Sequence, residues 1–232
     1  MIVDGTKIKV VRKNIKNVHL YVKPPKGDVT ITCPPDFSNE NVRFFARSKL
    51  PWILKKKEEE ENHPRQTKRE YVTGETVYLW GKGYYLVVKC SQKKYEIKLS
   101  SDSIQFTVRK GSTIEQRESA MEAWFRKILR QEINLLLPKW EKKTGLQAAS
   151  FRIEKMITRW GSCNQKRESL LFNLFLVQKP KDCLNYVILH ELAHTVEGKH
   201  NKKFVAILDK FMPNWVEIKR TLNSSISSPW ED

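Results

Sequence analysis

The stretch that decides the fold is VILHELAHTVEGKH, residues 187–200. It belongs to a predicted helix from about Cys183 to Glu197, which Asp182 is placed to cap and Gly198 to end. Apolar residues recur along one side of this helix and predict packing against a core: Leu184, Val187, Ile188 and Leu192. The sequence therefore predicts a rigid, partly buried helix at this point of the chain.

Within this helix, the string HELAH matches the pattern H-E-x-x-H. His190 and His194 are four residues apart, so their side chains project from one face, one turn apart. Two imidazoles at that spacing can hold one zinc ion, and Glu191 can reach a water on the metal without being a ligand. With 5 His and 26 acidic residues in 232, chance gives such a match in roughly 0.01 of chains, so the motif gains its weight from the helix around it.

A third ligand is expected just beyond the helix. His200 follows the break at Gly198, and Asn201 is placed to cap the next helix, so the loop that carries His200 is held at both ends. Glu197 and Glu217 are rival third ligands, although solvated surface positions suit both. The predicted zinc site is therefore His190, His194 and His200.

Three protein ligands leave zinc one position for a water molecule, whose pKa zinc lowers to about 7. Glu191 would take the proton of that water as it attacks a carbonyl carbon, and could pass it to a leaving amine. The predicted reaction is the hydrolysis of an amide, in the first place a peptide. Tyr186 and Arg159 are candidate oxyanion or substrate contacts, with a packing residue and a surface ion pair as the alternatives.

Working outward, the sequence predicts a strand over 151–157, a turn at Gly161-Ser162 and an apolar strand over 170–177. If that last strand has an exposed edge, an extended peptide could pair with it, but its apolar run favours an ordinary core strand. A long helix is predicted over 114–143, with Pro138 bending or dividing it.

The N-terminal part is predicted to be rich in strands. Alternating residues predict a hairpin of strands 18–22 and 29–33, followed by a helix that Ser38 caps. Short strands over 71–108 predict an antiparallel meander. The fold class is α+β, with a β-rich region over 1–112, a catalytic region over 113–222 and a tail over 223–232.

The composition is that of a globular protein, with 40% hydrophobic and 30% charged residues. The net charge of +17 favours polyanionic partners such as nucleic acid, or else a solubilising surface. Four scattered cysteines without a C-x-x-C pair, no signal peptide and no long apolar run predict a cytoplasmic protein that does not enter the membrane.

The sequence resembles the YgjP-like metallopeptidase family, described as predicted metal-dependent hydrolases and as zincin relatives of the SprT-like proteases. The resemblance rests on RWGSC at 159–163, LLFNLFL at 170–176 and YVILHELAH at 186–194, and extends through RSKLPWILKK and YVTGETVYLWGKGYYL over nearly the whole chain. The family often has Ser-Pro soon after the third histidine, where this chain has Asn201-Lys202. The resemblance implies a zincin-like α+β catalytic region with zinc on His190, His194 and His200 and with Glu191 as the base.

Two alternatives to a zinc peptidase remain open at the level of the sequence. One is a basic nucleic-acid-binding protein with a structural or vestigial metal site, or a DNA-associated protease, since SprT-like proteases act near DNA. The other is hydrolysis of a non-peptide amide, for which the site chemistry would be the same.

Overall fold

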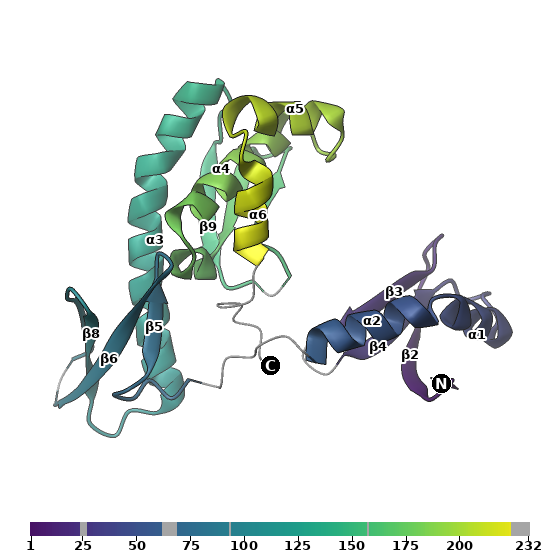
Figure 1. The fold of residues 1–232 in the computed structure, drawn as a ribbon, viewed down its shortest axis with the longest axis horizontal. Helices are drawn as coiled ribbons and strands as arrows, with labels where there is room; N and C mark the ends of the chain where they lie inside the picture. Colours follow the sequence, from purple (N-terminus) through teal and green to yellow (C-terminus); the bar gives the residue numbers. More distant parts are fainter. Residues whose placement is uncertain (24–26, 62–68, 93, 157, 224–232) are drawn as a thin grey trace. The chain divides into compact units, whose positions relative to one another are not determined.

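The computed structural model describes every residue except 24–26, 62–68, 93, 157 and 224–232. Contacts divide the chain into two compact units, Met1–Gln66 and Thr67–Pro229. Each unit combines helices with small sheets (Figure 1), which is the α+β class that the sequence predicts. Within the described ranges, every helix is too short or too polar for a membrane crossing.

The first unit is a four-stranded sheet packed with two helices. Its sheet has the order β1 (Ile2–Val3), β2 (Thr6–Arg12), β4 (Asp28–Cys33), β3 (His19–Lys23), and its helices are α1 (Asn39–Ser48) and α2 (Leu50–Glu61). β3 and β4 form the predicted antiparallel hairpin, and Ser38 caps α1 as predicted. β2 pairs with β4 in parallel, so the unit contains more than hairpins.

The second sheet has the order β5 (Thr76–Leu79), β6 (Lys82–Ser91), β8 (Ser103–Arg109), β7 (Glu96–Leu99). The predicted antiparallel meander is wrong at one step, because β6 and β8 pair in parallel and β7 lies on the outer edge. The reason is the burial of β8, whose Ile104, Phe106 and Val108 are almost fully buried. A strand with that apolar face gains most from a central place in the sheet.

The long helix α3 (Ile114–Thr144) confirms the prediction over 114–143. The Thr113 and Gln116 side chains cap its start reciprocally, and Gly145 ends it with a φ of 77°. Pro138 does not divide the helix. In Figure 1 the sheet β5–β8 lies at one end of α3, and the later helices lie along its other half.

A third, small sheet follows, with the order β10 (Gly161–Asn164), β11 (Ser169–Asn173), β9 (Ser150–Glu154). The strand predicted over 170–177 is too long, because the Asn173 side chain accepts a hydrogen bond from the Phe175 backbone and starts a 3-10 helix, η1 (Leu174–Gln178). The prediction of a turn at Gly161-Ser162 is also wrong, since both residues belong to β10. β11 is the central strand and β10 is an edge strand. The open edge therefore lies at β10 and not at the strand predicted over 170–177, which was the candidate for pairing with a peptide.

The last three helices are α4 (Lys181–Val196), α5 (Lys202–Phe211) and α6 (Trp215–Asn223). α4 packs against α3, α5 and α6 (Figure 1). The Trp140 indole donates a hydrogen bond to the Asn185 side chain at 2.8 Å and joins α3 to α4. Asp182 is not the cap of α4, because the helix already begins at Lys181; it lies in the first turn, where its negative charge suits the helix dipole.

The sheet β5–β8 belongs to the same unit as the helices, whereas the sequence places a boundary after residue 112. The turn between β5 and β6 is hydrogen-bonded to the end of η1. The Trp80 and Gly81 amides donate to the Val177 and Gln178 carbonyls at 2.8 and 3.1 Å. Both parts share one hydrophobic core. These bonds and this core explain why residues 69–112 go with the rest of the second unit. Of the tail expected over 223–232, all but Asn223 lies outside the described residues.

Candidate metal centre

The H-E-x-x-H motif lies in the last two turns of α4. The helix brings His190 and His194 to one face, and their ring centroids are 4.8 Å apart. The chain leaves the helix at Glu197, turns back at Gly198 and places His200 beside them, before Asn201 caps α5 as predicted. The ring of His200 is 5.0 Å from that of His190 and 4.7 Å from that of His194.

The three imidazoles converge through their Nε2 atoms. Nε2 of His200 is 3.0 Å from Nε2 of His194 and 3.1 Å from Nε2 of His190. Tetrahedral zinc with Zn–N bonds of about 2.0–2.1 Å requires N–N distances of about 3.3 Å. The three residues therefore fit a single metal ion, and they are the metal-capable group that the described residues contain.

The other ring nitrogens of two histidines have partners. Nδ1 of His194 is 2.9 Å from the Glu197 carbonyl oxygen, and Nδ1 of His190 is 3.3 Å from the Tyr186 hydroxyl. A carbonyl only accepts, so Nδ1 of His194 donates to it, and Nε2 is the ring nitrogen left to face a metal. Contacts of this kind fix the tautomer and orientation of a metal-binding imidazole.

Two of the rings, His190 and His200, are also held in their neutral form. Burial, followed by the proximity of His194 and His200, lowers the pKa of His190 to about 3. Burial and the neighbouring His194 also lower the pKa of His200. Neutral imidazole is the form that binds a metal, so the site favours ligation over protonation at neutral pH.

Phe204 of α5 lies against all three histidines. The centroid of its ring is 4.8, 4.6 and 4.7 Å from those of His190, His194 and His200, and its side chain is buried. An aromatic ring in contact with each imidazole restricts their rotation from the core side. Phe204 therefore supports the geometry of the site without offering a ligand.

Glu191 is buried beside this group, with a relative exposure of 4%. Its Oε2 has no hydrogen-bond partner in the described structure. Burial raises the pKa of Glu191 to about 8, against the opposing charge of Arg159. A buried carboxyl oxygen without a partner is costly in a folded protein and often marks a functional site.

A pocket of about 640 Å³ opens over these residues. The floor is α4, one wall is β10 with the residues just before it, and another wall is α6. The pocket is lined by Arg159, Trp160, Gly161, Ser162, Cys163, Gln165, Tyr186, Val187, His190, Glu191, His194, Gly198, His200, Phe204, Val205, Trp215, Lys219, Leu222 and Asn223. The metal-capable group and Glu191 are therefore open to a ligand of peptide size.

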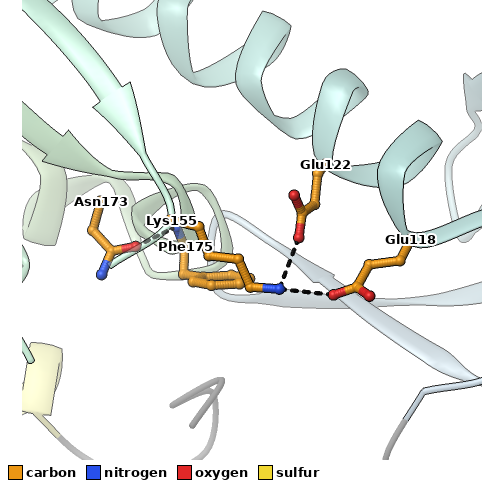
Figure 2. A network of polar contacts seen from close by, with 5 residues as sticks. All are labelled: Glu118, Glu122, Lys155, Asn173 and Phe175. Atoms are coloured by element: carbon orange, nitrogen blue, oxygen red, sulfur yellow. Dashed lines mark hydrogen bonds and ion pairs between the residues drawn. The ribbon is translucent and has the colours of Figure 1, made fainter. Parts of the chain in front are cut away.

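The chain before β10 is held by Asn173, which is fully buried. Its side-chain amide donates to the Met156 and Arg159 carbonyls, at 2.9 Å each, and its backbone amide donates to Trp160. Figure 2 shows Asn173 beside Phe175, over which Lys155 extends. Asn173 thus fixes the backbone that carries Arg159 into the pocket.

Most of the predicted site residues lie in one pocket, but the two rival ligands do not belong to the metal-capable group. His190, His194, His200 and Glu191 lie together, Arg159 and Tyr186 line the same pocket, and the Tyr186 hydroxyl contacts Nδ1 of His190. The rivals Glu197 and Glu217 are outside the metal-capable group. The Glu197 carboxylate accepts a hydrogen bond from the Lys199 amide.

Sequence reasoning missed three residues that shape the site: Gly161, Asn173 and Phe204. Gly161 was available as a signal, since a glycine inside a strand often marks a close approach. The role of Asn173 depends on the 3-10 turn after β11, and that of Phe204 on the packing of α5, so neither has a local signal.

Comparison with known proteins gives one match to a family. The family described as "YgjP-like, metallopeptidase domain" matches residues 16–225. No curated protein matches the sequence. Two solved structures are similar in part: the metallopeptidase zymogen abylysin of Pyrococcus abyssi, with 19% identity over 40% of this chain and 94% of that one (TM-score 0.38), and the metallopeptidase zymogen jannalysin of Methanocaldococcus jannaschii, with 24% identity over 40% and 90% (TM-score 0.33).

Proposed function

The chain belongs to the YgjP-like metallopeptidase family and is a metal-dependent hydrolase, and from this premise we propose that it is a zinc peptidase with Glu191 as its general base. The observation that carries the proposal is the convergence of three Nε2 atoms next to a buried carboxyl oxygen without a partner. His190, His194 and His200 would hold the ion. A set of three imidazoles suits zinc better than magnesium or calcium, which prefer oxygen ligands.

Zinc bound there would lower the pKa of a water in its open position to about 7, and its charge would favour the carboxylate form of Glu191. Glu191 would then transfer a proton from the attacking water to the leaving amine. Its unpartnered Oε2 takes the proton of the attacking water and holds it away from solvent, because the side chain is buried. The same oxygen returns the proton to the leaving amine, so one residue acts as base and then as acid.

Arg159 is the proposed contact for the scissile carbonyl or the substrate backbone. It lines the pocket and its charge acts on Glu191, which places its guanidinium within electrostatic reach of the reaction. Tyr186 is proposed as a positioning residue for His190, on the basis of its hydroxyl contact with Nδ1. The exposed edge of β10 forms a wall of the pocket and would accept an extended peptide by strand addition.

We further infer a zincin-like arrangement, in which the motif helix lies under a small sheet with one open edge. α4 packs against β10 and β11, and β10 supplies the edge. All of the proposed site residues fall within the catalytic region proposed over 113–222.

The test is a metal assay combined with a cleavage screen. Purified chain is expected to bind one zinc ion and to cleave members of a broad peptide library. Glu191→Gln should retain the zinc and lose cleavage, because the amide cannot take up a proton. Glu217→Gln is the matched control, since Glu217 lies on the exposed face of α6 outside the metal-capable group. Full activity of Glu191→Gln would rule out its role as the base.

A nucleic-acid-binding protein, or a DNA-associated protease, is a second candidate, favoured by the net charge of +17. Binding through phosphate contacts would be steeply salt-dependent. Titration of duplex DNA and single-stranded RNA at several salt concentrations tests it, and weak binding with a flat salt response would remove it.

A further inference from the structure

One face of α6 forms a wall of the pocket. Trp215, Lys219, Leu222 and Asn223 line it, and their spacing of four, three and one is that of a single helical face. The Lys219 ammonium lies over the Trp215 ring, 5.8 Å from its centroid. Lys219 lines the same pocket as the three histidines of the metal-capable group.

The pocket has a cationic lining. Apart from the histidines, its charged residues are Arg159, Glu191 and Lys219. Glu191 is the proposed base, so Arg159 and Lys219 are the charged residues that remain to contact a ligand. They lie on different walls of the pocket. In the described part of the chain neither cation forms an ion pair. Arg159 acts electrostatically on Glu191, whereas Lys219 has no carboxylate partner in the described residues and is free to attract a negatively charged group of a ligand.

The pocket is bridged close to Lys219. The Trp160 indole donates a hydrogen bond to the Asn223 side chain at 3.1 Å, which joins the wall before β10 to the end of α6. Asn223 is one helical turn beyond Lys219. Lys219 therefore lies one helical turn from the hydrogen bond that joins the two walls.

The chain on either side of His200 carries three lysines and one carboxylate, that of Glu197. Lys199, Lys202 and Lys203 are exposed there, within a few residues of the proposed third ligand. The excess of exposed positive charge around His200 raises the local concentration of anionic ligands near the site.

We propose that Lys219 is a specificity-determining residue that binds a carboxylate of the substrate, so that the peptidase prefers peptides with a carboxylate next to the scissile bond. The carboxylate is either the C-terminus of the peptide or an Asp or Glu side chain. Arg159 on the other wall adds to the same preference. This inference rests on the proposed peptidase function and names the substrate class of that site.

The experiment uses the full-length, zinc-loaded chain with Glu191→Gln, which retains the pocket without consuming the peptide. The probes are an alanine peptide with a free C-terminus, its C-terminal amide, and amidated forms with Glu or Gln at successive positions. Equilibrium affinities are measured by calorimetry for each acid and its neutral twin. Zinc loading is checked in every sample, because a free carboxylate can also bind the metal.

The acid form is expected to bind about tenfold more tightly than its neutral twin, the effect of one charge-assisted hydrogen bond in a partly exposed site. Lys219→Met should remove this preference, and Lys219→Glu should make Lys-containing peptides the better ligands. Lys89→Glu, an equal charge change on β6 outside the pocket, should leave the preference intact. A preference for the free C-terminus alone would identify the chain end as the source, and one that follows Glu would identify the side chain.

Equal affinities of acid and neutral twins in the unsubstituted pocket, or a preference that survives Lys219→Met, would overturn the proposal. The binding readout is independent of turnover. Absence of cleavage in the wild-type chain would therefore count against the peptidase function, while the acid preference would still be measured.

Discussion

Gly161 of β10 lies against Glu191 of α4 so closely that a Cβ atom on the glycine would be 2.4 Å from Oε1 of the carboxylate. All three of its nearest atoms belong to that side chain. The open-edge strand and the proposed base can therefore be neighbours only if residue 161 has no side chain.

Gly161→Ala is expected to displace the Glu191 carboxylate or the strand. A shift of about 1 Å at a reacting group can cost about 100-fold in rate, so kcat should fall by that order. Zinc content should not change, because the added methyl group meets Glu191 and not the histidines. Cleavage assays with metal analysis on the same samples test this, and an alanine variant with wild-type kcat would contradict it.

Tyr186→Phe separates the two roles considered for this residue. The ring stays stacked on Trp215, at a centroid distance of 6.3 Å, and only the hydroxyl contact with His190 is lost. If the hydroxyl positions His190, zinc affinity should fall by about 10- to 100-fold. Competition with a zinc chelator measures the affinity. An unchanged affinity with a strongly reduced kcat would instead assign Tyr186 to the transition state.

Asn173→Asp tests the hold on the backbone before β10. The aspartate can still accept from the Phe175 amide, but it places an oxygen where the amide now donates to the Met156 and Arg159 carbonyls. Two partly buried carbonyls lose their donor, which should lower the free energy of unfolding by about 2 kcal/mol. Denaturant unfolding measures the loss. Because Arg159 is carried by that backbone, kcat/KM should fall as well, even at temperatures where the variant is folded.

Lys155 gives a prediction for the dependence of stability on pH. Figure 2 shows its ammonium between Glu118 and Glu122 of α3, at 2.8 and 3.0 Å. Burial acts to lower the pKa of Lys155, but the two hydrogen-bonded carboxylates outweigh it and raise the pKa above the ordinary 10.5. The stabilisation is therefore fully present below pH 10.5 and is lost as the pH rises through the higher pKa of the folded state.

Lys155→Met should lower the free energy of unfolding by no more than about 1 kcal/mol, because the group is 45% exposed. The loss should be equal at neutral and mildly alkaline pH and should shrink only above pH 10.5. Urea unfolding across that range measures it. Lys98→Met is the control, because the Lys98 side chain, which pairs with Glu96, is more exposed than that of Lys155, at 68%. A loss that disappears already in the neutral range would contradict the raised pKa.

The sequence predicts the motif helix and the shared face of its two histidines correctly, for a physical reason. Two histidines four residues apart share a helical face whatever the rest of the fold is, and an asparagine after a glycine break caps the next helix locally. The convergence of His200 on the other two rings is the part that needs the tertiary structure.

Strand order and edges were harder to predict. The apolar run Leu170–Val177 has the same character in β11 and in the 3-10 helix after it, so composition does not mark the turn at Asn173. The parallel pairing of β6 with β8 skips the strand between them, and neighbours in sequence are the default expectation. The contact of Gly161 with Glu191 joins residues 30 positions apart and has no local trace.

The contacts of the Trp80-Gly81 turn determine how short a fragment can be while it keeps the contacts around the motif helix. A chain shortened to begin at residue 113 would leave the Val177 and Gln178 carbonyls without their donors, and would remove the Trp80 ring over which the Lys181 ammonium lies at the start of the motif helix. Gly81 also packs directly on Pro180, so the loss would reach the first residue before that helix. Anyone excising the hydrolytic part for study or engineering should cut between the two compact units, upstream of Arg69, and should carry the β5–β8 sheet along.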